Sequence, residues 1–578
     1  MRLASVATIV AGALIGGPAA GRAGDEVTFK ARALAEIVRA VPGMLKAQDP
    51  ETGRFGEGIW IVTEQNVLFP LAVAWATKDP TNPYYHSDEL LGAIMAGGDA
   101  LIDDQDASGQ WEFRKKDGST WGKIYMPWTY SRWIRAYALI RDAMPAERRE
   151  RWVKALRLGF DGIARTSLNH MQNIPAHHAM CLYIAGQVFD EPAWTQQAAD
   201  FLGKVVAAQD KAGYWSEHMG PVVNYNMVYV DALGTYYAVS GDKSVLPALR
   251  RAAVFHLHFT YPNGALVETV DERNPYYART VLPNVGFSFS PEGRTFVARQ
   301  LAALGESAAL SADGMASFLL YGEEGPGVPA KDLDADGDFV LGDRDAVIRR
   351  RGPWFIVVSA MRCPISGSRW IQDRQNFVSV YHKKAGLILG GGNTKLQPGW
   401  STFTVGDPRG SSLREGDTNP NFNPPAGLLH VPTKAVLITD GDVGVDFEYG
   451  EQRCAVGVKI LDDDRIEYRV SAAEPGAAPV AAHVTLLPKM GEAVASASGK
   501  GLTLGDEAWA WPAGVAGEWM EHAGVRFDLP PAASVRWPVL PHNPYTRDGH
   551  AAPGEGRIVI DLPLTAEAAE QCVRIIVR

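Results

Sequence analysis

The spacing of hydrophobic residues changes once along this chain, and that change limits the fold more than any other feature. From about residue 28 to residue 322, apolar residues recur at i, i+3 and i+4, as they do in amphipathic helices. A stretch rich in Gly and Pro follows at 322–330, and beyond it short runs are dense in β-branched and aromatic residues. The sequence therefore predicts a multidomain α+β protein with its helices first and its strands second.

Connections rich in Gly, Pro and Asp separate the expected helices, so successive helices should pack as hairpins. The expected helices cover residues 29–41, 89–102, 127–142, 147–164, 175–188, 194–208, 225–239 and 244–259. The expected strands cover residues 354–359, 377–381, 387–389, 435–438, 465–470, 482–487 and 557–560. Because 578 residues are too many for one core, we expect an α/α toroid over 27–322, a linker over 323–344 and an antiparallel β-sandwich over 345–578.

The first residues have the pattern of a secretory signal. Met1 and Arg2 give a short basic start, an uncharged apolar run covers 3–15, and small residues before Ala20 and Ala23 offer cleavage sites. The run is too short to span a bilayer, and no later stretch approaches the ~20 apolar residues that a span requires. We predict a signal peptide over residues 1–23, export to the periplasm or the medium, and no membrane span.

Composition and charge narrow the class of partner. Apolar residues make up 46% of the chain and charged residues 21%, which is typical of globular proteins. The formal net charge of −10 argues against broad nucleic-acid binding. The net charge is compatible with binding of an acidic polymer, because a local basic cleft can oppose the electrostatic field of the whole protein. The 16 tryptophans suit the flat faces of sugar rings, although most tryptophans in proteins fill core.

Two further features bear on metals and disulfides. Four scattered cysteines lack any CxxC or zinc spacing; Cys181 should be buried, and pairing among the other three is left open. Residues 332–343 place Asp at the spacing of a calcium loop. No helix clearly flanks this segment, and residues 339–341 fit the first strand of the β domain equally well. We therefore favour no metal and no required cofactor, with calcium at Asp332–Asp343 as the alternative.

The residues best suited to chemistry gather between 169 and 237. Pro175 is a natural first-turn residue, so Asn173 should lie at or near the N-cap of a helix that carries His177 and His178. A helix N-terminus disfavours imidazolium and attracts carboxylate, so a histidine there tends to stay neutral and fit to act as a base. Tyr225 opens a later helix. Each residue also has a structural explanation, as a cap or as core, but the cluster of Asn, His and Tyr favours a site.

These segments resemble heparinase II/III-like and alginate-lyase-like polysaccharide lyases. The similar segments are residues 128–133, 173–186, 225–233, 269–276, 373–381 and 386–392. The resemblance implies an α/α toroid followed by a β-sandwich, with Asn, His and Tyr on the toroid. The chain differs in having Ile174 rather than His directly after Asn173, and its β strands lack the histidine of the metal site that some relatives carry.

The implied reaction is β-elimination on a uronate-containing polysaccharide, which requires these residue types. Asn173, with or without Arg132, would neutralise the uronate carboxylate so that the proton on C5 becomes acidic. His177, His178 or a tyrosinate would take that proton, and Tyr225 would protonate the leaving oxygen. The expected substrate-binding residues are Trp128, Arg132, His218, Tyr229 and Arg273, and His218 is a second candidate for the base.

Two other functions fit parts of the sequence. A glycoside hydrolase on the same helical scaffold would use two carboxylates, drawn from Glu217, Asp231 and Asp271. A non-catalytic glycan-binding protein would keep the fold without the chemistry. Only a lyase makes an unsaturated uronate, so ultraviolet absorbance of the product separates the first function from the other two.

Overall fold

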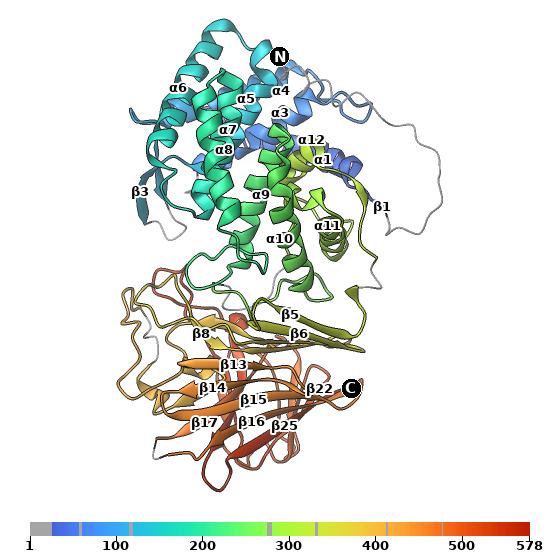
Figure 1. Cartoon of the computed structure of the whole chain (residues 1–578), viewed down its shortest axis with the longest axis vertical. Helices are drawn as coiled ribbons and strands as arrows, with labels where there is room; N and C mark the ends of the chain where they lie inside the picture. The colour runs from blue at the N-terminus through green and yellow to red at the C-terminus, as the bar shows by residue number, and fades with distance from the viewer. Residues whose placement is uncertain are drawn as a thin grey trace. The chain divides into compact units, whose positions relative to one another are not determined.

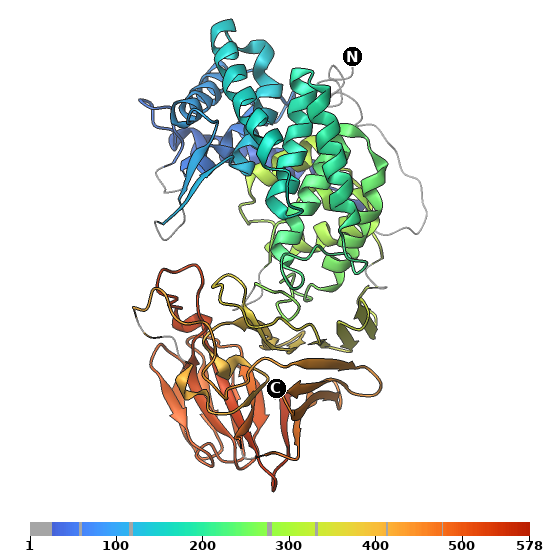
Figure 2. The same cartoon turned by 60° about the vertical axis from the view of Figure 1, so that its left-hand side comes forward.

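The computed structural model describes residues 26–56, 61–114, 119–273, 280–329, 333–411, 414, 416–476 and 478–578. The predicted signal peptide over residues 1–23 lies outside this range. The chain forms two compact units (Figures 1 and 2). The helical unit comprises residues up to 215, 224–257 and 281–330, and the sheet unit comprises 216–223, 258–280 and 331–578. Two segments from the helical half of the sequence therefore belong to the sheet unit.

Helices follow one another through the first half of the chain. They are α1 (Lys30–Lys46), α2 (Ile61–Glu64), α3 (Leu68–Ala76), α4 (Asp88–Asp104), α5 (Pro127–Ile140), α6 (Ala146–Thr166), α7 (Asn173–Phe189), α8 (Pro192–Ala207), α9 (Val223–Ser240), α10 (Leu246–His258), α11 (Pro291–Leu304) and α12 (Ala312–Tyr321). The turn from α7 into α8 shows how local sequence ends them: Asp190 adopts a left-handed conformation at φ 55°, and Pro192 starts the next helix.

The sheet unit is built on two antiparallel sheets. The ten-stranded sheet runs in the order β20 (Trp509–Trp511), β23 (Ser534–Val539), β24 (Arg557–Leu564), β17 (Val480–Leu486), β10 (Gly386–Leu389), β9 (Val378–His382), β7 (Trp354–Ser359), β6 (Ala346–Arg351) and β5 (Gly337–Leu341), with β12 (Phe403–Val405) also paired to β17. The nine-stranded sheet runs β13 (Lys434–Ile438), β14 (Val443–Tyr449), β15 (Gln452–Ile460), β16 (Arg465–Ala473), β25 (Glu570–Val577), β22 (Val525–Asp528), β21 (Trp519–His522), β18 (Ala493–Ser496) and β19 (Gly501–Thr503). One hydrophobic core draws on both sheets. The multidomain α+β prediction, with helices before strands, is confirmed.

Burial along the strands follows the pleat. In β16 buried and more exposed residues alternate, because one face of this strand packs on the core and the other meets solvent. In β7 every residue is buried. The second face of the ten-stranded sheet is covered there by the segment 258–273, whose Tyr261 stacks on Tyr381 at 5.5 Å and meets the ring of Phe355 at 5.4 Å. This contact is part of what holds that segment in the sheet unit.

Short two-stranded sheets complete the structure. The pairs are β1 (Glu26–Val27) with β4 (Gly325–Pro326), β2 (Trp111–Arg114) with β3 (Thr120–Ile124), and β8 (Asp373–Asn376) with β11 (Gly392–Thr394). The β2–β3 hairpin stands among the helices and was not expected from the hydrophobic spacing, because its strands are too short to set a period of two over several residues.

The acidic segment proposed as an alternative calcium loop contains strand β5, which covers Gly337–Leu341. Asp332 lies outside the described residues. The Asp338 carboxylate accepts two hydrogen bonds from Arg349, at 2.9 and 2.6 Å, and Asp336 accepts one from the Gly352 amide at 2.8 Å. These two carboxylates are therefore engaged with groups of the chain itself, and calcium binding stays a prediction.

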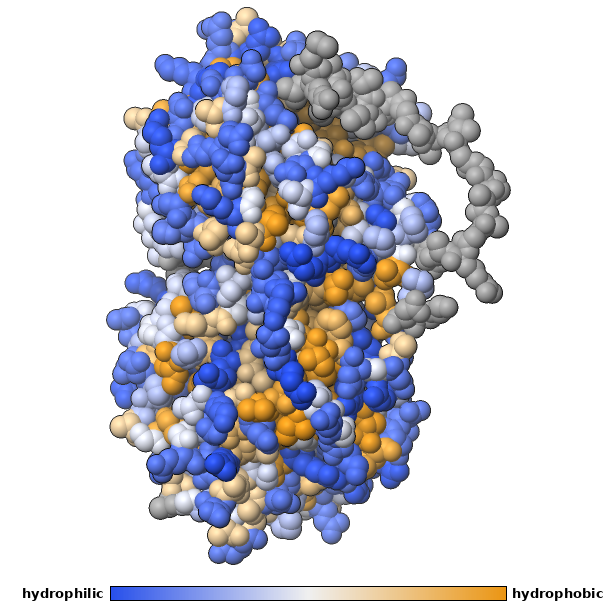
Figure 3. Space-filling view, in the orientation of Figure 1, coloured by the Kyte–Doolittle hydropathy of each residue, from blue (hydrophilic) through white to orange (hydrophobic). Residues whose placement is uncertain are grey.

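All four cysteines are free; Cys181, Cys363 and Cys454 are buried and Cys572 is exposed. Hydrophobic residues gather in several patches on the face drawn in Figure 3, among a larger number of hydrophilic ones. Among the helices that the structure describes, none combines the length and the hydrophobicity needed to span a bilayer.

Candidate active site

Helices α5, α7, α9 and α12 of the helical unit run parallel to one another. Along each pair of helices, the contacting residues follow in the same order. Helix α7 contacts α9 through His177–Asp231 and Gln187–Val239, and it contacts α5 and the turn after it through Arg132–His177 and Arg141–Val188. Helix α5 contacts α12 through Arg132–Asp313 and Arg135–Ser317. The four helices therefore begin at the same end. We call their first turns, residues 127–130, 173–176, 224–226 and 312–315, the N-terminal rim.

The rim gathers the positive ends of several helix dipoles. The first backbone N–H groups of a helix have no partner within the helix, so they and the dipole together favour an anion. The contact between His177 of α7 and Asp231 of α9 also fixes how far along the helix axes the rim side chains lie. Asn173 lies four residues before His177 and Tyr225 six before Asp231, or ~6 and ~9 Å along their axes. The two side chains thus leave their helices at nearly the same level, and both are partly exposed.

Beneath the rim lies a layer of charged groups centred on Arg132. Its guanidinium donates to both carboxylate oxygens of Asp313, at 3.0, 3.1 and 2.7 Å, and its Nη1 lies 3.1 Å from Nε2 of His177. Because arginine only donates, Nε2 of His177 must accept, which places the imidazole hydrogen on Nδ1. Nδ1 faces the Asp231 carboxylate at 3.7 Å. The donors of Arg132 are therefore largely used within the protein.

The two adjacent histidines are buried. His177 has no exposed surface, and its ring packs edge-on against Trp128 at 4.5 Å. His178 is 4% exposed, and its Nε2 lies 2.7 Å from the backbone oxygen of Tyr125, to which it donates. Each imidazole therefore contacts the start of α5. His177 packs against Trp128, the second residue of that helix, and His178 bonds to Tyr125, just before the helix begins.

Burial sets the charge of these groups. Burial, together with the charges of Arg132 and Arg135, holds the pKa of His177 well below its usual value. Burial lowers the pKa of His178 to about 4. Burial alone would raise the pKa of Asp313, but the Arg132 charge and its hydrogen bonds outweigh it and hold that pKa below its usual value. At neutral pH the layer therefore contains two neutral imidazoles and an ionised Arg132–Asp313 pair.

The remaining predicted residues are divided between the two units. Tyr229 lies in the helical unit, 1% exposed and stacked on Trp215 at 5.0 Å, where it forms core. His218 and Arg273 lie in the sheet unit. His218 is exposed, and Arg273 donates to the Trp370 backbone oxygen at 3.0 Å.

The segment that carries His218 is anchored by two acids of the sheet unit. The Met219 amide donates to Glu272 at 2.9 Å, and the Val223 amide donates to Asp271 at 2.7 Å. Asp271 also accepts from the Arg273 amide at 2.6 Å. Asp271, one of the acids considered for a hydrolase, thus supplies a carboxylate to the backbone where α9 begins.

Sequence reasoning missed one member of the layer and shifted another. Asp313, the partner of Arg132, was not singled out; an acid in the first turn after Ser311 was the available signal. Asn173 is the first helical residue of α7, and Gln172 precedes it as the N-cap without a side-chain cap bond. Among the described residues, no three His, Cys, Asp or Glu side chains converge so as to hold a metal ion.

The buried His178 predicts how stability depends on pH. An unfolded histidine takes up a proton near pH 6.5, whereas the folded one does so only near about 4, so the unfolded state binds more protons between these values. Stability should therefore fall as pH drops from 6.5, by ~2 kcal/mol at pH 5 from this residue. A His178→Gln variant, whose amide can keep the bond to Tyr125, should show a shallower loss in urea unfolding at pH 7 and 5. Equal losses in both proteins would contradict this assignment.

Comparison with known proteins shows the fold. No family model matches the chain, and no curated protein matches its sequence. Among solved structures, the chondroitin AC lyase of Streptomyces coelicolor A3 superposes with a TM-score of 0.56 at 13% identity, over 100% of this chain and 82% of that one. Heparinase III gives 0.55 at 12% identity, over 100% and 89%. A Paenibacillus xanthan lyase gives 0.53 at 13% identity, over 95% and 57%. The predicted resemblance to heparinase-like polysaccharide lyases is confirmed at the level of fold.

Proposed function

We propose that this protein is an exported polysaccharide lyase that cleaves a uronate-containing polysaccharide by β-elimination. The observation that carries the proposal is the N-terminal rim, where Asn173 and Tyr225 leave neighbouring parallel helices at nearly the same level. The fold supports the same class, because the similar structures are named as lyases of chondroitin and xanthan and as a heparinase.

The first requirement of the reaction is to neutralise the uronate carboxylate. The proton on C5 becomes removable only when charge developing on the carboxylate finds hydrogen-bond donors. The Asn173 amide and the backbone N–H groups in the first turns of the rim helices are donors of this kind. Arg132 lies one turn deeper with its donors committed to Asp313 and His177. Its proposed role is to hold the helices in register.

The second requirement is proton transfer. The C5–H bond breaks, its electron pair forms the C4–C5 double bond, and the C4–O bond breaks as the leaving oxygen takes a proton. Tyr225 is partly exposed at the rim, so its hydroxyl is our candidate for the donor to that oxygen. The base that accepts the C5 proton is Tyr225 itself, as tyrosinate, or the exposed His218.

The buried histidines take a positioning role in this scheme. A base must touch the substrate, and neither His177 nor His178 has the exposed surface to do so. The Nε2 lone pair of His177 also accepts from Arg132. We assign His177 to the orientation of Arg132 and His178 to the attachment of α7 to the start of α5.

The glycoside hydrolase alternative is less well supported. It requires two carboxylates that act on one glycosidic bond. Asp271 accepts from two backbone amides, and Asp231 faces Nδ1 of the fully buried His177. A non-catalytic glycan-binding protein stays as the second alternative, and turnover distinguishes it.

The deciding experiment is a screen of the purified protein on uronate polymers, with ultraviolet absorbance of the unsaturated product as the readout. Alginate, glucuronan, heparinoids and rhamnose–glucuronate polymers should be included. Absorbance that rises with at least one polymer supports the proposal. New reducing ends without that absorbance would indicate a hydrolase, and binding without any cleavage would indicate a glycan-binding protein.

A further inference from the structure

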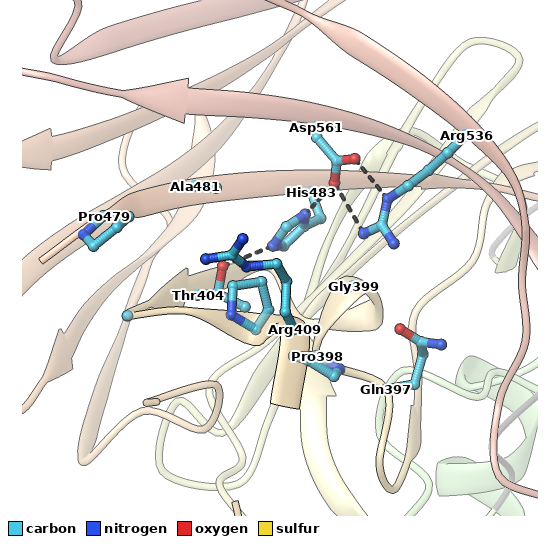
Figure 4. Close-up of a pocket in the computed structure, with 12 residues that line it drawn as sticks. Gln397, Pro398, Gly399, Thr404, Arg409, Pro479, Ala481, His483, Arg536 and Asp561 are labelled. Carbon is cyan, nitrogen blue, oxygen red and sulfur yellow. Dashed lines mark hydrogen bonds and ion pairs between the residues drawn. The ribbon is translucent and has the colours of Figure 1, made fainter. Parts of the chain in front are cut away.

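A polar pocket lies on the outer face of the ten-stranded sheet, entirely within the sheet unit (Figure 4). Thr404, His483 and Asp561 alternate along β12, β17 and β24 with residues of the core, so they point to the face away from it. Turns carrying Pro398, Pro408 and Pro479 contribute to its walls. Its volume of about 450 Å³ lies in the ~300–1,000 Å³ range of small-molecule sites.

A chain of hydrogen bonds joins Thr404, His483 and Asp561 on the floor of the pocket. Burial alone would raise the pKa of Asp561, but hydrogen bonds from His483 and Arg536 outweigh it and keep that pKa below its usual value. The ionised Asp561 accepts from Nδ1 of His483 at 2.6 Å. In the neutral tautomer that has its hydrogen on Nδ1, His483 accepts at Nε2 from the Thr404 hydroxyl, 2.9 Å away. Thr404 itself is buried, so of these groups the partly exposed Asp561 is the acceptor that a ligand can reach.

Two arginines supply donors beside these acceptors. Arg536 donates to Asp561 from Nε at 2.7 Å and from Nη2 at 3.2 Å. Arg409 donates to Asp407 from Nε and Nη2 at 2.6–3.0 Å. In the part of the chain that the structure describes, neither Nη1 group donates to a protein acceptor. Gln397, on the wall of the pocket, donates a hydrogen bond from Nε2 to the Leu540 backbone oxygen at 2.9 Å. Its side-chain oxygen is a further acceptor.

One glycine makes this arrangement possible. A Cβ atom added at Gly399 would overlap the guanidinium of Arg536. The absence of a side chain at Gly399 therefore lets Arg536 lie against the backbone while it pairs with Asp561.

The mixture of donors and acceptors identifies the kind of ligand. A carboxylate or sulfate only accepts, so it would satisfy the arginines but face the oxygens of Gln397 and Asp561 without a hydrogen to share. Sugar hydroxyls both donate and accept, and proline rings offer apolar surface to the C–H face of a sugar. We infer that this pocket binds a single neutral, hydroxyl-rich sugar residue, at a site separate from the N-terminal rim.

The test is calorimetric titration of the full-length protein with glucose, galactose, mannose and rhamnose, and with glucuronate as the anionic comparison. We expect at least one neutral sugar to bind with a Kd of about 1 mM, and glucuronate to bind more weakly at the pocket. Gly399→Ala, which displaces Arg536 but removes no polar group, and Arg409→Ala should each weaken binding about tenfold. Arg465→Ala is the matched control, because it removes a half-exposed arginine from a similar pair with Asp462 away from the pocket.

Two outcomes would overturn the inference. One is that no neutral sugar binds, or that glucuronate alone does. The other is that a neutral sugar binds equally well to Gly399→Ala, Arg409→Ala and the parent protein. Neither outcome depends on lyase turnover, so failure here and failure of the proposed function can be told apart. Circular dichroism of both variants should match the parent, since Arg409 is an exposed side chain and Arg536 is long enough to move.

Discussion

Replacing Tyr225 by Phe is expected to lower turnover on a cleaved polymer by ~10²- to 10⁴-fold, the usual contribution of a general acid or base. Phe keeps the ring, and therefore its contacts with sugar and with neighbouring side chains, while it removes the hydroxyl. KM should change little, because the lost group acts on the leaving oxygen in the transition state. Initial rates from product absorbance, measured over a range of polymer concentrations, check both statements.

The matched control is Tyr237→Phe on the same helix. Tyr237 is partly exposed and lies twelve residues beyond Tyr225, ~18 Å along the axis of α9, so the loss of its hydroxyl should leave turnover unchanged. A His218→Ala variant then locates the base: a loss comparable with that of Tyr225→Phe assigns the base to His218, and a small loss assigns it to Tyr225. Unchanged turnover in Tyr225→Phe would remove this residue from the mechanism.

Replacing Asn173 by Asp should lower activity while it leaves stability unchanged or slightly higher. Asp is close to Asn in shape, but its charge repels the uronate carboxylate and it cannot donate, so turnover should fall by at least ~10²-fold. Asn173 is the first residue of α7, where a negative charge interacts favourably with the helix dipole by ~0.3–1 kcal/mol. The melting temperature should therefore stay the same or rise slightly while activity is lost.

Asn173→Ala gives the complementary comparison. Because Gln172 rather than Asn173 occupies the N-cap, the loss of the amide should cost little stability while turnover still falls. A variant that melts earlier yet keeps full activity below its melting temperature would show that Asn173 is only a structural residue. Activity retained in Asn173→Asp would contradict carboxylate neutralisation at this position.

Much of the fold could be predicted because its signals are local. The helices from 127 to 240 begin and end within about two residues of their expected positions, since the helical period, Pro at the first turn and turn residues at the ends are all short-range features. The strand expected at 354–359 coincides with β7. The rim residues were found for a similar reason: Asn173 and Tyr225 both stand at helix starts, which the sequence marks.

Which side of a helix is buried depended on the tertiary structure. His177 and His178 are adjacent on α7, and an amphipathic helix would expose at least one of two such neighbours. Helix α7 is buried almost all round from Pro175 to Gly186, so both imidazoles are enclosed. We therefore propose a positioning role in place of the base role suggested by their place near a helix N-terminus, because access to substrate depends on neighbours that the local sequence does not describe.

Long-range partners were also beyond the reach of the sequence. Arg132 pairs with Asp313, 181 positions away, and no pattern within either helix links them. The segments 216–223 and 258–280 interrupt a helical stretch, yet their hydrogen bonds to each other and to β9 place them, with His218 and Arg273, in the sheet unit. The sequence by itself determined where helices and strands form, since the hydrophobic period and the turn residues act over a few positions. Only the tertiary structure decided which charges meet and which histidines see solvent, because burial and pairing depend on residues far away in the chain.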